Sequence, residues 1–123
     1  MSTRSPAAIL GAASILSLAG YAPIQKVPAW ADGPWASGKI PAHAFRLELV
    51  GAEGRYESAD CRGYLDLLET NGERVVFAYA LATGQPDCAS HGTVLISGFD
   101  GTSARYRWYD SEGWALEEVR IHR

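Results

Sequence analysis

Hydrophobic and polar residues alternate along most of the chain beyond residue 34, which is typical of half-buried β-strands. The clearest case places Phe45, Leu47 and Leu49 on one face and polar residues between them. Turn signals recur about every 8–12 residues, so we expect an all-β fold, a small antiparallel β-barrel or β-sandwich of about seven to eight strands. The expected strands cover residues 35–40, 45–49, 54–57, 61–69, 74–82, 92–98, 104–109 and 114–122.

The pair Asn71-Gly72 lies between two apolar runs and predicts a hairpin with a two-residue turn. In that register Leu67 faces Val76, so small and aliphatic residues share one face and suit the inside of a narrow barrel. The opposite face is aromatic. It is either covered by another layer or exposed as a platform for a ligand or partner. The aromatic residues proposed for this platform are Tyr64, Phe77 and Tyr79.

The segment before the last strand holds the densest cluster of arginines and aromatic residues. Ala104, Tyr106 and Trp108 alternate there with a second set, Arg105, Arg107 and Tyr109. Residues of these types are enriched in interface hot spots. The segment is therefore a candidate partner surface, and the alternative is that Trp108 is core while the arginines face outward. The last strand changes parity, which predicts a bulge at Glu117-Glu118.

The two cysteines, Cys61 and Cys88, each precede a short apolar strand and stand in step with its buried face. They predict one inward-facing disulfide in an exported domain. The chain-entropy relation gives a bridge of this span roughly 3.5 kcal/mol of stabilisation. The alternative is a pair of reactive or metal-binding thiols, but the spacing lacks the C-x-x-C pattern of a metal site.

The N-terminus predicts export. Arg4 precedes an uncharged apolar run over residues 7–19, which is typical of a secretory signal peptide and short for a membrane span. We expect residues 1–31 to be signal peptide and linker, cleaved after Ala31, or after Ala22 or Ala19, leaving a single all-β domain at 32–123. The protein would be secreted or held in the cell envelope, with no membrane span after processing.

Charge argues against a nucleic-acid partner. The formal net charge is −3, and loss of the two basic residues in 1–31, Arg4 and Lys26, would make it −5. An acidic domain does not suit a polyanion.

Motifs for catalysis or metal binding are not found in the sequence. His43, His91 and His122 lack ligand spacing, so we expect no metal and no cofactor. Ser90 and His91 are adjacent, and neighbouring strand residues point to opposite faces, so we expect them not to meet. The remaining candidate chemistry is a carboxylate pair of the kind used in glycoside hydrolysis. The available carboxylates are Asp60, Asp66, Glu69, Asp110, Glu112, Glu117 and Glu118.

Several short motifs between residues 35 and 123 together resemble a small exported domain common in actinobacteria, found alone or outside membrane-anchored kinases. The resemblance implies a disulfide-tied β domain outside the cell and carries no catalytic residues with it. The motifs are Trp35-Ala36-Ser37-Gly38, Tyr56, Cys61-Arg62-Gly63-Tyr64-Leu65-Asp66-Leu67, Phe77, Thr83-Gly84, Cys88, Gly92-Thr93-Val94-Leu95-Ile96, Tyr106-Arg107-Trp108 and Ile121-His122-Arg123.

These observations together predict an exported, non-enzymatic binding or interaction module. Its partner would be an extracellular protein or an envelope glycan. One form of this hypothesis is an inhibitor of an extracellular hydrolase that acts through the loop at residues 83–87. The alternatives are a small hydrolase that uses a surface carboxylate pair, and a structural accessory domain without its own ligand.

Overall fold

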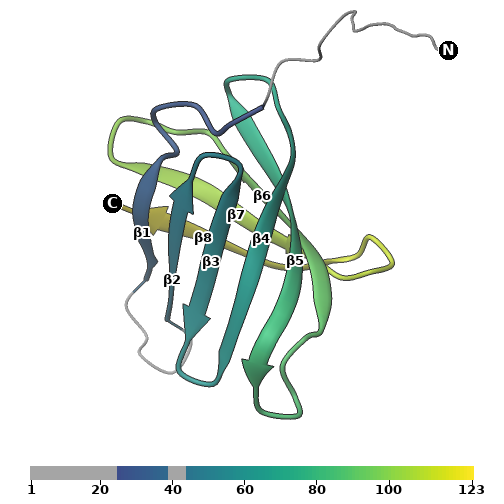
Figure 1. Ribbon diagram of the computed structural model, residues 1–123. Coiled ribbons are helices and arrows are strands. Elements are labelled where there is room, and N and C mark those ends of the chain that lie inside the picture. The colour runs from purple at the N-terminus through teal and green to yellow at the C-terminus, as the bar shows by residue number, and fades with distance from the viewer. Residues whose placement is uncertain (1–24, 39–43) are drawn as a thin grey trace, which may run out of the picture.

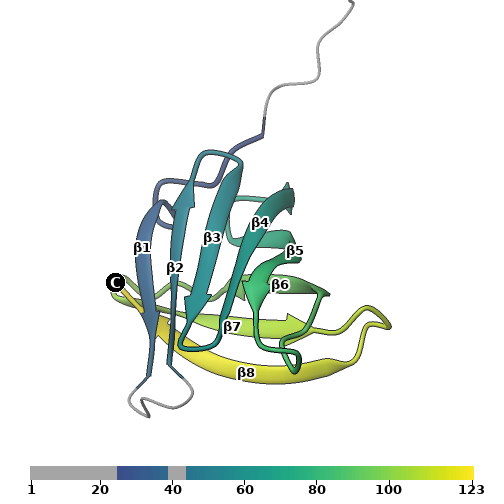
Figure 2. The ribbon, with the colours of Figure 1, turned by 60° about the horizontal axis from the view of Figure 1, so that its bottom comes forward.

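Eight antiparallel strands form one closed barrel in the computed structural model of the protein (Figures 1 and 2). The structure describes residues 25–38 and 44–123, so residues 1–24 of the predicted signal peptide and linker, and His43, lie outside the described residues. Each strand pairs with the next, and β1 pairs with β8 to close the barrel. The strands are β1 (Gly33–Ser37), β2 (Phe45–Val50), β3 (Glu53–Ser58), β4 (Cys61–Thr70), β5 (Arg74–Gly84), β6 (His91–Ser97), β7 (Ser103–Tyr109) and β8 (Ala115–His122).

The all-β prediction is confirmed, and a barrel rather than a sandwich is formed. Within residues 25–38 and 44–123 the structure has no helix, and therefore no helix that is long and apolar enough to cross a bilayer.

The alternation in the sequence determines which residues enter the barrel. Phe45, Leu47 and Leu49 of β2 are buried while Arg46 and Glu48 are exposed. On β7, Ala104, Tyr106 and Trp108 are buried, as expected for the core alternative. The buried core runs the length of the barrel and includes Leu65, Val75, Phe77, Tyr79, Val94, Ile96 and Ile121.

The predicted register of the β4–β5 hairpin is wrong. Leu65 pairs with Tyr79, and Leu67 pairs with Phe77, one residue away from the predicted partners. The turn is wider than two residues because the Asn71 side chain accepts hydrogen bonds from the backbone nitrogens of Glu73 and Arg74.

Beside the turn Thr70 pairs with Val75, two residues from its predicted partner, and an irregularity between Leu67 and Glu69 reduces this to a shift of one residue. A second irregularity, between Arg62 and Gly63, restores the shift of two, so Cys61 pairs with Gly84. A one-residue shift turns every side chain of β5 to the other face. The aromatic side chains of β5 therefore fill the core, and the small residues of β5 face outward.

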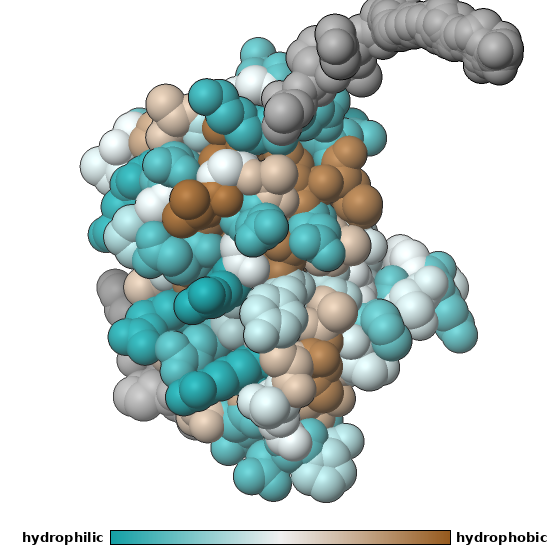
Figure 3. All heavy atoms as spheres, viewed as in Figure 1, coloured by the Kyte–Doolittle hydropathy of each residue, from teal (hydrophilic) through white to brown (hydrophobic). Residues whose placement is uncertain are grey.

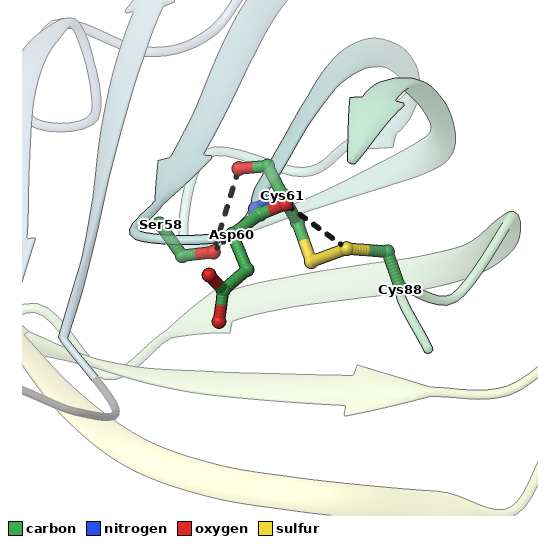
Figure 4. The surroundings of a disulfide bond; sticks show 4 residues. All are labelled: Ser58, Asp60, Cys61 and Cys88. Atoms are coloured by element: carbon green, nitrogen blue, oxygen red, sulfur yellow. Dashed lines mark hydrogen bonds between the residues drawn. A yellow bond between two sulfur atoms is a disulfide. The ribbon is translucent and has the colours of Figure 1, made fainter. Parts of the chain in front are cut away.

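The predicted disulfide is present between Cys61 and Cys88, whose Cα atoms are 5.9 Å apart. It ties the first residue of β4 to the loop between β5 and β6 (Figure 4). The side chain of Ser58 supports the same corner: its oxygen accepts a hydrogen bond from the Cys61 nitrogen at 3.1 Å. The bridge therefore holds two loops together at one end of the barrel.

The other end of the barrel is closed by residues 27–31, which we call the plug. Val27 and Ala31 are buried in the core, and the Val27 nitrogen donates a hydrogen bond to the Gly51 carbonyl oxygen. Trp30 stacks on Phe99 with 5.5 Å between ring centroids. The plug is therefore part of the folded unit.

Aromatic and cationic contacts hold the plug in place. The Trp35 indole nitrogen donates to the Ala31 carbonyl oxygen at 2.8 Å. The Arg123 guanidinium lies 4.8 Å from the centre of the Trp35 ring and donates to the Trp30 carbonyl oxygen. The C-terminal residue and the plug thus stabilise each other.

Replacing both cysteines by alanine should lower the free energy of unfolding by roughly 3.5 kcal/mol, because the unfolded chain regains the entropy of a long loop. Urea unfolding followed by circular dichroism measures the loss. Dithiothreitol should destabilise the parent protein by a similar amount and leave the Cys61→Ala/Cys88→Ala variant unchanged. Equal stability of the parent with and without reductant would contradict this expectation.

A chain that begins at Asp32 should be less stable than one that begins at Pro23 by about 3–5 kcal/mol, because it loses buried Val27 and the Trp30–Phe99 stack. Urea unfolding of the two chains measures the difference, with Lys26→Ala as the exposed control.

For the same reason we expect the signal peptide to be cut after Ala22 or Ala19, which N-terminal sequencing of the exported protein checks. Equal stability of the two chains would remove the argument for an earlier cut.

Candidate functional site

The end of the barrel opposite the plug opens into a hollow of about 330 Å³, which we call the mouth. The volume is within the usual range for small-molecule sites, about 300–1,000 Å³. Its walls are mainly aromatic and aliphatic, and the disulfide lies at its rim. The residues that line it are Tyr56, Cys61, Tyr79, Ala89, Trp108, Leu116 and Glu117.

One interior layer of the barrel builds the mouth, and large and small residues alternate along it. Tyr56 on β3 pairs with Gly63 on β4, and Tyr79 on β5 pairs with Gly92 on β6. Trp108 on β7 then pairs with Glu117 on β8. Alternation of large and small residues is how small barrels fill a tapering interior. The layer across β3–β8 reads Tyr56, Gly63, Tyr79, Gly92, Trp108 and Glu117.

The two glycines of this layer are needed because aromatic rings lie directly on them. A methyl group added at Gly63 would lie 2.1 Å from Cε1 of Tyr79. One added at Gly92 would lie 2.6 Å from Cζ2 of Trp108. Any side chain at either position would force a ring away from the barrel wall and into the hollow.

Aromatic contacts fix the rings of the mouth relative to one another. Tyr79 meets Trp108 edge to face at 4.6 Å between centroids, and Tyr56 meets Tyr79 in the same way at 5.5 Å. Tyr56 also stacks on Phe45, which packs against Tyr106 one layer deeper in the barrel. The floor of the mouth is therefore a continuous cluster of five rings.

A bulge at Leu116 decides which glutamate faces the mouth. Tyr109 pairs with Ala115 and Trp108 pairs with Glu117, which leaves Leu116 as the extra residue. The bulge therefore lies at Leu116, one residue before the predicted position at Glu117-Glu118. Since directly paired residues share a face of the sheet, Glu117 takes the interior face with Trp108. Glu118 points outward.

Burial keeps the tyrosines of this cluster in their neutral phenol form. Burial is the largest cause that raises the pKa of Tyr56, Tyr79 and Tyr106. The negative charge of Glu117 also raises the pKa of Tyr56 and Tyr106, while a hydrogen bond with Ser58 lowers that of Tyr56. The phenols therefore offer neutral hydroxyl groups to whatever occupies the mouth.

Of the residues predicted to form an aromatic platform, the structure leaves only Tyr64 on the surface. Phe77 and Tyr79 are buried because of the register shift, although Tyr79 reaches the wall of the mouth. Tyr64 lies on the outer face of β4 beside Arg55 and Arg62, in a shallow hollow of about 420 Å³. The three do not form one surface.

The predicted cluster on β7 divides between the two faces of the strand. Trp108 faces inward to the mouth, while Arg105 and Arg107 face outward and pair with Glu118 at 3.5 and 2.9 Å. Tyr109 and Glu118 both raise the pKa of Arg107 through hydrogen bonds. The outward residues are thus joined in an ion-pair network along β7 and β8.

We expected the side chains of Ser90 and His91 not to meet. This is wrong, because Ser90 Oγ lies 3.2 Å from His91 Nδ1. Ser90 precedes β6, so strict strand alternation does not hold there. Both residues are exposed and neither lines the mouth. Within residues 25–38 and 44–123 no cluster of three or more histidine, cysteine, aspartate or glutamate side chains could hold a metal ion.

Much of the surface is polar, as the face shown in Figure 3 illustrates. The loop between β7 and β8 projects beyond the rest of the barrel in both ribbon views (Figures 1 and 2). Large exposed hydrophobic residues on this hairpin are Trp114, 69% exposed, and Leu116, 60% exposed. The projecting hairpin therefore brings apolar surface next to the mouth.

Sequence reasoning missed Tyr56, Glu117 and Tyr106 as parts of one site. Their meeting depends on registers across β3–β8, which no single strand pattern reveals. The available signal was the pair of glycines, Gly63 and Gly92, at inward positions of strands that are otherwise apolar.

No protein-family model, curated protein or solved structure matches this chain. The site therefore has to be interpreted from its own geometry.

Replacing Gly63 by alanine should destabilise the protein by about 1–3 kcal/mol, because the Tyr79 ring must leave its place on the β4 wall. Urea unfolding measures the cost, and near-ultraviolet circular dichroism reports the displaced ring. The control is Gly38→Ala, where nothing lies near the added methyl group and the change should stay within about 0.5 kcal/mol. Equal effects of the two substitutions would argue against this packing.

Proposed function

We propose that the chain is an exported, non-enzymatic binding module whose binding site is the mouth of the barrel. The observation that carries the proposal is the hollow itself, in which apolar walls surround a few polar groups. Ligand sites typically combine a mostly apolar lining with a small number of placed polar groups. Tyr56, Tyr79 and Trp108 supply the apolar surface, and phenol hydroxyls with the Glu117 carboxylate supply the polar groups.

The frame around the mouth supports binding because it is held rigid before any ligand arrives. The disulfide fixes one side of the rim, and edge-to-face contacts fix the rings. A site that is already ordered loses less conformational entropy on binding. Export, predicted from the N-terminus, agrees with a structural disulfide, which persists in oxidising compartments.

The carboxylates of the mouth favour binding over hydrolysis. Glycoside hydrolysis uses two carboxyl groups about 5–9 Å apart. Of the lining residues that the structure describes, Glu117 is the single one with a carboxylate. A small hydrolase and an accessory domain without a ligand remain the alternative hypotheses.

A second candidate function is contact with an extracellular protein through the projecting β7–β8 hairpin. Exposed aromatic and aliphatic residues at the tip of a loop are common anchors in interfaces. Trp114 is the residue that favours this hypothesis, because 69% of its surface is exposed. An inhibitor of an extracellular hydrolase would use such a tip, or the loop at residues 83–87.

The mouth proposal is tested by adding probes of four classes to ¹⁵N-labelled protein: phenol, N-acetylglucosamine, benzoate and choline. We expect at least one probe to shift the amide signals of Gly63 and Gly92 and the Trp108 indole signal. Ala89 is exposed at the rim, so Ala89→Phe should fill the hollow and weaken binding at least tenfold. Ala52→Phe, at the plugged end, is the matched control and should leave the affinity unchanged.

If none of the four probes shifts these signals at millimolar concentration, the proposal fails. It also fails if Ala89→Phe and Ala52→Phe have equal effects.

A further inference from the structure

Building on the proposed function, we infer that the ligand of the mouth is an organic cation, a protonated amine carried on an apolar or aromatic stem. The inference rests on two features of the mouth: the sign of its charge and the aromatic rings around that charge.

Among the described residues that line the mouth, the only charged side chain is the carboxylate of Glu117. The basic side chains of the adjoining strand are turned away from it. Arg105 and Arg107 lie on the outer face and pair with Glu118. Arg62, near the opposite rim, pairs outside the barrel with Glu57 at 3.1 Å. A concave site with one sign of charge and apolar walls concentrates ligands of the opposite sign.

The aromatic lining favours the same ligand class. The faces of tyrosine and tryptophan rings carry partial negative charge and attract ammonium groups. Tyr56, Tyr79 and Trp108 all border the hollow that Glu117 enters. An anion would meet repulsion from both the rings and the carboxylate. A neutral ligand would gain the apolar contact without the charge interaction.

Tyr106 adds a buried hydrogen-bonding group. The residue has no exposed surface, and its hydroxyl has no hydrogen-bond partner in the structure. A buried hydroxyl group without a hydrogen-bond partner lowers the stability of the folded protein. The neighbours that raise its pKa, after burial itself, are Tyr56, Glu117 and Tyr79. Tyr106 does not line the mouth and packs against Phe45 behind it, so its hydroxyl meets a ligand only if the rings in front of it move.

A metal ion fits the site less well than an organic cation. Calcium takes six to eight oxygen ligands, and magnesium requires a near-octahedral shell. The mouth supplies one carboxylate and neutral phenols, among large apolar surfaces. Glu117 also interacts within the protein, so the inference depends on its charge and position and does not require it to be unpartnered.

The test compares three probes of similar shape and different charge: 2-phenylethylamine, 2-phenylethanol and phenylacetate. Affinities are measured at pH 7 from the shifts of the Gly63, Gly92 and Trp108 signals. We expect the protonated amine to bind at least tenfold more tightly than the alcohol, and phenylacetate to bind more weakly than both. Because the preference is electrostatic, added salt should reduce it and leave the affinity for the alcohol almost unchanged.

Two glutamates that are adjacent in sequence supply matched variants. Glu117→Gln should reduce the affinity for the amine at least tenfold and leave that for the alcohol within about twofold. Glu118→Gln, on the outer face, should change neither. Glu117→Asp keeps the charge and should retain part of the preference, which separates loss of charge from loss of folding.

The outcomes distinguish the two proposals. If the alcohol or phenylacetate shifts the same signals with an affinity equal to that of the amine, the cation inference is overturned while the binding site stands. If none of the three probes shifts them, the binding site itself is contradicted. If Glu117→Gln and Glu118→Gln weaken amine binding equally, the preference does not come from the mouth and the inference fails.

Discussion

The limited width of an eight-stranded barrel is the constraint on which the rest of this structure depends. Such a barrel has an interior just wide enough for side chains. Tyrosine and tryptophan rings fit side by side in one layer only where the neighbouring strands contribute almost no volume. Gly63 and Gly92 meet that requirement, and the rings of Tyr79 and Trp108 lie on them. The positions of two glycines therefore determine where the aromatic cluster forms.

The two ends of the barrel differ because different segments reach them. At one end the plug buries Val27 and Ala31, and Trp30, Trp35 and Phe99 close over them. At the other end the strands finish in an aromatic layer with open space above it. The disulfide lies at the rim of the mouth, where it joins the start of β4 to the loop between β5 and β6.

Two consecutive glutamates have different environments in this fold. Glu118 lies outside the barrel and is neutralised by Arg105 and Arg107, while Glu117 lies among the rings of the mouth. The difference follows from the single extra residue at Leu116, which sets the parity of the strand. Exposed ion pairs of the outer kind contribute little to stability. Glu117 is itself exposed, and it lines the mouth beside aromatic walls, where its charge acts on a ligand together with the rings.

The sequence by itself determined the strand content, the disulfide and the inward faces of β2 and β7. These are local properties, since alternation along one strand is enough to separate Phe45 from Arg46 or Trp108 from Arg107. Register and closure were decided only by the tertiary structure. The Asn71 side chain widened the hairpin turn, an irregularity between Leu67 and Glu69 brought Phe77 and Tyr79 to the inward face, and a bulge turned Glu117 toward the mouth. Such shifts depend on packing between strands that are distant in sequence. For that reason the plug and the mouth could not be predicted from any one segment.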